Sequence, residues 1–256
     1  MTPQEKLISV ALAEVGYIEK ASNANLDSDT ANAGSNNYNK YARDLDALLD
    51  FYNGRKNGYD WCDVFVDWCF VQAFGKELAL KLLEAPLRSC GAGVKYSAQY
   101  YKSDGRFHTS RPQPGDQIFF GDSSSWWHTG IVTKVDSKYV YTIEGNTSGA
   151  SGVISNGGGV AQKKYLLSYQ YIKGYGRPDW SIAEEEEEVT QEQFNKMMDT
   201  YLAARAKKAP SSWSAKARAW AEKLGLIKGT GTQMEYRNFI TREEVAEILY
   251  RYSQSK

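Results

Sequence analysis

The chain has 256 residues, 31 basic and 31 acidic side chains, and an aromatic content of 13%. This length allows one domain with a substantial core and a smaller second domain. Zero net charge does not favour a nucleic-acid partner, which needs a basic excess, and no stretch is apolar for long enough to span a bilayer.

The N-terminal sequence bears on where the protein is made, and the cysteines bear on disulfides and zinc. Residues 1–5 lack the basic and apolar regions of a secretory signal, so we expect synthesis in the cytoplasm without a signal peptide. Three cysteines are an odd number, and Cys62 and Cys69 lie about two helical turns apart, too far for a disulfide. The sequence contains neither a Cys-x-x-Cys pair nor a paired-His spacing, so it does not predict a zinc site.

The first part of the chain predicts helices. Thr2-Pro3-Gln4-Glu5 is a capping box before a helical stripe that stops at Gly16. Residues 21–37 are rich in Asn, Ser, Asp and Gly and predict a loop. Helical spacing then returns over residues 38–52, 61–74, 76–84 and 93–103, of which 61–74 is apolar on nearly all sides and should be central.

After Pro112 the pattern changes to the alternation of strands, expected at 117–120, 128–135, 139–144 and roughly 165–175. Helices followed by an antiparallel sheet predict an α+β domain over residues 1–180. Five consecutive glutamates, 184–188, predict an acidic linker over 181–188. Residues 189–256 contain 12 Lys and Arg against 7 Asp and Glu and predict a separate, small all-α domain.

A cysteine, a histidine and an acid follow one another along the chain. Cys62 stands in the first turn of the central helix, with Asp60 as the expected N-cap, where the helix dipole favours a thiolate. His128 begins a strand and can accept the thiol proton. Glu144 ends the next strand and can orient the imidazole, with Asn146 as the alternative. These residue types predict cysteine-dependent acyl transfer.

Plainer interpretations stand beside this one. Cys69 and Cys90 are expected to be core residues, His108 a surface residue, and Glu144 could be an ordinary strand-end acid. Four aromatic residues either wall a substrate groove or pack the sheet edge: Tyr59, Trp61, Trp126 and Trp127.

The spacing of polar residues in the loop over 21–37 suggests one cofactor, a calcium ion. Asn25, Asp27, Asp29 and Asn32 are spaced like calcium-binding loop oxygens, although the loop lacks the terminal Glu of an EF-hand. A plain Asn-rich loop is therefore the favoured interpretation. The expected chemistry requires no cofactor, and calcium at Asp27 and Asp29 is an additional expectation.

Four segments in order carry a family resemblance: Trp-Cys-x-x-Phe-Val-x-Trp around Cys62, Pro114–Phe120, His128–Val132 and Glu144–Thr147. Over about residues 1–178 they resemble the CHAP domain of cysteine, histidine-dependent amidohydrolases and peptidases. The resemblance implies a papain-like fold and cleavage of peptidoglycan, either at the muramic acid–L-alanine amide or within its peptides. It also implies Cys62 as nucleophile, His128 as base, and Glu144 or Asn146 as the third member.

The C-terminal part carries a second resemblance. WAEKLGLIKGTG and ITREEVAEILYRY resemble the later part of an S-layer homology repeat, in a single copy. This implies a module that binds a cell-wall polymer, with a helical homodimerisation tail as the alternative. The whole chain most resembles a phage or prophage endolysin, which would act on the bacterial wall after release. The alternative function is a non-catalytic wall-binding protein on the same scaffold.

Overall fold

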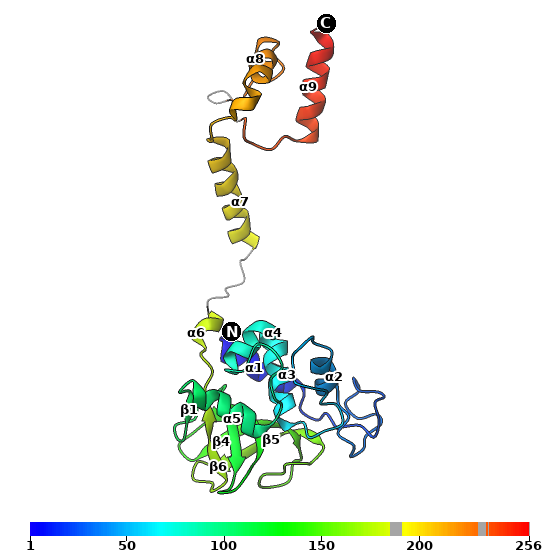
Figure 1. Cartoon of the computed structure of the whole chain (residues 1–256), viewed down its shortest axis with the longest axis vertical. Coiled ribbons are helices and arrows are strands. Elements are labelled where there is room, and N and C mark those ends of the chain that lie inside the picture. Colours follow the sequence, from blue (N-terminus) through cyan, green and yellow to red (C-terminus); the bar gives the residue numbers. More distant parts are fainter. Residues whose placement is uncertain (185–190, 230–233, 235, 256) are drawn as a thin grey trace. The chain divides into compact units, whose positions relative to one another are not determined.

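The computed structural model describes residues 1–184, 191–229, 234 and 236–255. The chain divides into two compact units, Met1–Glu186 and Glu187–Lys256, here called the first and the second unit. In the first unit, helices precede an antiparallel sheet, so the α+β prediction is confirmed (Figure 1).

Five helices of the first unit follow the pattern expected from the sequence: α1 Pro3–Ala13, α2 Lys40–Asp46, α3 Cys62–Phe74, α4 Lys76–Leu82 and α5 Val94–Ser103. The capping box predicted at Thr2 and Glu5 is present. Helix α2 is shorter than expected: Asn39 caps its start by accepting a hydrogen bond from the Ala42 backbone N–H, and the helix already ends at Asp46, with Ala47 as its C-cap.

The sheet has six strands in the order β1-β6-β2-β3-β4-β5, all paired antiparallel. Their bounds are β1 Phe107–His108, β2 Gln117–Gly121, β3 Trp126–Val135, β4 Tyr139–Thr147, β5 Gly159–Leu166 and β6 Ile172–Gly176. The single strand predicted over residues 165–175 is wrong. A turn closed by the Tyr169 N–H on the Leu166 carbonyl separates β5 from β6, and β6 crosses to pair with β1 and β2.

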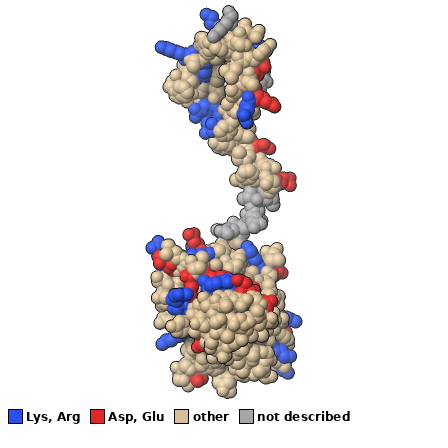
Figure 2. Space-filling view, turned by 90° about the vertical axis from the view of Figure 1, so that its right-hand side faces the viewer, with Lys and Arg blue, Asp and Glu red and all other residues tan. Residues whose placement is uncertain are grey.

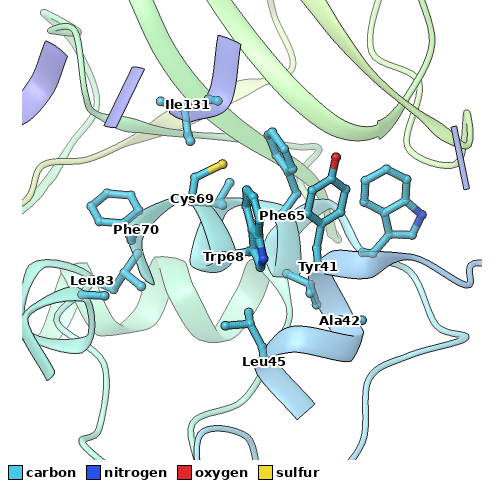
Figure 3. Packing of buried hydrophobic residues seen from close by; sticks show 14 of the residues in the cluster. Tyr41, Ala42, Leu45, Phe65, Trp68, Cys69, Phe70, Leu83 and Ile131 are labelled. Atoms are coloured by element: carbon cyan, nitrogen blue, oxygen red, sulfur yellow. The ribbon is translucent and has the colours of Figure 1, made fainter. Parts of the chain in front are cut away.

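Helix α3 lies at the centre of the largest hydrophobic cluster. It packs on α1, α2 and α4 and on strands β3 and β4. Figure 3 shows its Cys69 thiol surrounded by apolar side chains, with Ile131 of β3 above it. Cys69 is fully buried, and burial raises its pKa well above the usual value, so it is a core residue as expected.

The end of the first unit extends past the predicted domain boundary. Trp180 stacks on Phe70, and Ile182 and Ala183 of α6 (Ser181–Glu184) pack against the same cluster as α3. The predicted linker over 181–188 therefore begins with residues that belong to the first unit. Its remainder lies outside the described residues, as does most of the acidic run.

The second unit contains α7 Gln191–Ala206, a short 3-10 helix Ser212–Ser214, α8 Ala215–Lys223 and α9 Arg242–Gln254. Thr241 and Glu244 form the capping box expected at the start of α9. Among the described residues, none of the helices combines the length and apolar character of a membrane span. On the visible face of the first unit, basic and acidic side chains lie intermixed (Figure 2).

Candidate active site

The start of α3 presents Cys62. The helix begins at Cys62 itself, so its N-cap is Trp61, and the expected capping role of Asp60 is wrong. Trp61 has no side-chain oxygen and caps nothing, which leaves the positive end of the helix without a side-chain acceptor from its N-cap. Such a helix start favours negative charge on a thiolate or a bound oxyanion.

His128 and Glu144 form a buried pair on neighbouring strands. The Nε2 atom of His128 lies 3.0 Å from Oε2 of Glu144, and both side chains are fully buried. Two further donors fix the carboxylate: the Thr142 hydroxyl, 2.6 Å from Oε1, and the Tyr165 hydroxyl, 3.1 Å from Oε2. Glu144 is thus held in one orientation and in turn orients the imidazole.

The other imidazole nitrogen, Nδ1, is not engaged by Glu144. Among the described residues, Nδ1 of His128 is buried and has no hydrogen-bond partner. Burial alone would lower the pKa of His128, but the Cys62 thiol and the Glu144 carboxylate raise it, and the net pKa is about 10. The imidazole is therefore protonated at neutral pH and carries a positive charge close to Cys62.

Two glycines set the spacing of these groups. A Cβ at Gly130 of β3 would lie 2.5 Å from Cγ of Glu144, so the missing side chain makes room for the carboxylate. A Cβ at Gly145 of β4 would lie 2.4 Å from Cβ of Phe65. The backbone of β4 can therefore approach the first turns of α3, which carries Cys62.

A second buried network joins the residues that follow Cys62 and His128. The Gln117 amide nitrogen donates to Oδ1 of Asp63 at 3.0 Å and to the Thr129 hydroxyl at 3.1 Å. Asp63 also accepts from the Gly93 N–H and the Ser97 hydroxyl. Gln117 thus connects Asp63, which follows Cys62 in α3, to Thr129, which follows His128 in β3.

Asn146 lies apart from this pair. Its backbone is left-handed, with φ 52°, where the register between β4 and β5 shifts. Its side-chain oxygen accepts from the Gly158 N–H at 3.3 Å, and its carbonyl accepts from Gly157. The geometry brings together Cys62, His128 and Glu144, and it holds Asn146 against the turn that precedes β5.

The four predicted groove residues have different positions. Trp61 is fully buried, stacks on Tyr41 and donates to Glu19 at 2.8 Å, so the prediction that it walls a groove is wrong. Trp126 is half-buried and packs against the cluster that contains Cys62, with the Lys102 ammonium over its ring. Trp127 packs against a different cluster, where it meets Tyr171, and Tyr59 is 66% exposed.

The charged groups of the loop with calcium-like spacing have protein partners. Both carboxylate oxygens of Asp27 accept from the Arg43 guanidinium, at 2.7 and 2.8 Å. The backbone carbonyl of Asp29 accepts from the Ile18 N–H and from the buried Lys20 ammonium. Within the described ranges, no three Asp, Glu, His or Cys side chains gather in a way that could hold a metal ion.

Several residues of the site were missed from the sequence. Thr142 stands two residues before Glu144 on one strand, and the two-residue period of a strand would have placed both on the same face. Tyr165 was missed because one strand was predicted over residues 165–175, whereas Tyr165 lies near the end of β5. Gln117 and Asp63 are 54 positions apart, and nothing local signals their contact.

A family model matches the segment that contains Cys62, His128 and Glu144. The family model of the CHAP domain matches residues 54–146, so the chain contains a CHAP domain. No curated protein gives a significant match. The chain is similar to "The crystal structure of Ly7917", with 17% identity and a TM-score of 0.40 over 70% of this chain. The matched part spans 63% of that chain, less than two thirds of its length.

Proposed function

We propose that this CHAP-containing chain is a peptidoglycan hydrolase that cleaves an amide bond through a covalent acyl-enzyme on Cys62. CHAP domains are generally cysteine, histidine-dependent amidohydrolases or peptidases, a family that acts on peptidoglycan. The observation that carries the proposal is the buried His128–Glu144 pair, 3.0 Å apart, together with Cys62, which is close enough to His128 to raise its pKa.

Each group has a defined part in the proposed reaction. The Cys62 thiolate attacks the amide carbonyl carbon, and the first-turn N–H groups of α3 stabilise the oxyanion that forms. Protonated His128 gives its proton to the leaving amine as the C–N bond breaks. Neutral His128 then takes a proton from water, which attacks the thioester and releases the acid. Glu144 keeps the ring in place and stabilises its positive charge throughout.

A pair of matched substitutions tests the nucleophile. Cys62→Ala should abolish both the clearing of a Gram-positive cell suspension and the release of amino groups from purified walls. Cys69→Ala removes a thiol from the same helix, but from its buried side, and should keep activity while lowering the unfolding temperature. A Cys62→Ala variant that lyses cells normally would refute the mechanism. Wild-type protein that sediments with walls but releases no amino groups would instead be a wall-binding protein.

The identity of the cleaved bond and the biological role are finer parts of the proposal. We assign the chain the role of an endolysin, with the second unit binding a cell-wall polymer. Mass spectrometry of digested walls distinguishes amidase from endopeptidase activity by whether the glycan or the peptide carries the new end. The Cys62→Ala protein should still sediment with walls. Trp213 is 86% exposed in the second unit. If Trp213→Ala abolishes sedimentation with walls, that result would support wall binding by the second unit.

A further inference from the structure

Helix α7 carries an exposed apolar stripe. Phe194, Met197, Met198 and Tyr201 are 51%, 62%, 39% and 51% exposed. Their spacing of three and four residues places them on one face of the helix, and Leu202 continues that face. Four large apolar side chains side by side on a helix are unusual on a surface that faces only water.

The second unit as a whole buries little. Within its described residues, the buried hydrophobic side chains are those of Ala221 and Leu226. A unit of about 70 residues needs a much larger apolar core, a metal or an association to stay folded. The stripe on α7 is therefore the kind of surface that a partner covers.

The charges at the two ends of α7 identify the partner. Glu192 lies in the first turn of α7, whereas Arg205 lies in its last turn and Lys207 and Lys208 follow its C-terminal end. An antiparallel copy of the same helix places opposite charges together at both ends. A parallel copy would place like charges together, which is unfavourable, and would also align the two helix dipoles.

We propose that the chain forms a homodimer in which α7 of one copy packs antiparallel on α7 of a second copy. A two-fold axis at Met198 places Phe194 of each copy opposite Leu202 of the other and Glu192 close to the partner's Arg205. Such an interface is closed and self-complementary. The proposal does not depend on the chemistry of Cys62, and it would give each assembly two catalytic units on one wall surface.

Sedimentation equilibrium of the full chain tests the dimer. Wild-type protein should show twice the chain mass of 28.8 kDa. Phe194→Glu adds a charge within the stripe and should shift the mass to that of one chain. Ala203→Glu adds the same charge on the opposite face of α7 and should leave the dimer intact. A single-chain mass for the wild type, or equal masses for the two variants, would overturn the proposal. Circular dichroism checks that both variants keep their helices.

Cysteine cross-linking tests the antiparallel orientation. The native cysteines are all buried, and all three lie in the first unit. Met198→Cys lies on the proposed axis and should form a disulfide-linked dimer on oxidation. Glu192→Cys should not, because two antiparallel copies hold residue 192 about 18 Å apart along the helix axis, beyond disulfide reach. Efficient cross-linking of Glu192→Cys would show a parallel arrangement instead.

Discussion

Gln117→Leu removes the buried amide that joins the helix of Cys62 to the strand of His128. Two hydrogen bonds disappear, one to the Asp63 carboxyl at 3.0 Å and one to the Thr129 hydroxyl at 3.1 Å. A hydrogen bond to a charged group contributes about 1.5–3 kcal/mol and a neutral one about 1 kcal/mol. Leucine also removes the Gln117 carbonyl oxygen, which is buried without a partner among the described residues, and this offsets part of the loss. We expect a net loss of about 2–3 kcal/mol in the free energy of unfolding.

The same substitution should lower catalytic turnover more than the loss of stability explains. A displacement of about 1 Å between reacting groups costs on the order of 100-fold in rate. Urea unfolding measures the first effect, and the initial rate of amino-group release from walls, under conditions where the variant is folded, measures the second. Gln162→Leu makes the same change at an exposed position of β5 and should alter neither. A variant at Gln117 that loses stability but keeps wild-type turnover would refute a positioning role, and one that loses neither would refute the network itself.

Three further substitutions test the site. Glu144→Gln should lower the pKa of His128 from about 10 and reduce turnover by about 10²–10⁴-fold. Proton NMR of the two histidines can follow the titration of His128. An unchanged titration midpoint would contradict the pairing of His128 with Glu144. Because the folded-state pKa of His128 is raised from 6.5 to about 10, its contribution to stability is complete below pH 6.5 and is lost as the pH rises through about 10. Urea midpoints across that range should fall more steeply for the wild type than for His128→Gln, and parallel curves would argue against a raised pKa. Gly145→Ala should cost about 1–3 kcal/mol, because its Cβ would lie 2.4 Å from Phe65, whereas Gly149→Ala has open space and serves as the control. Equal midpoints for the two glycine variants would show that β4 can move away from α3.

The parts of the fold that were predictable from the sequence depend on local signals. The capping boxes at Thr2 and Thr241 fix helix starts through residues three positions apart, and both are present. The break between β5 and β6 carries no comparable signal. Residues 167–171 are Leu-Ser-Tyr-Gln-Tyr, which alternate between apolar and polar side chains as in a strand. The turn there is closed by backbone hydrogen bonds, and no residue type in this segment indicates them.

The candidate site shows the same division between local and distant information. Cys62 and His128 stand out because one begins a helix and the other lies near the start of a strand. The choice between Glu144 and Asn146 could not be made from spacing alone, because it depends on a register shift against β5 that turns Asn146 toward Gly158. Trp61 looks like a substrate contact because it precedes Cys62, but its burial is decided by Glu19 and Tyr41, far away in the sequence.

The buried position of Trp61 has a practical consequence for shortening this chain. The family match begins at residue 54, yet the indole beside Cys62 lies against side chains from the first 41 residues. A version cut at that boundary would expose a large apolar ring beside Cys62 and leave the indole N–H without Glu19. It would also lack β5 and β6, the pairing partners of β4 and β2. The shortest segment that keeps these contacts is therefore about twice as long as the segment matched by the family model, and it runs from α1 to the end of the first unit.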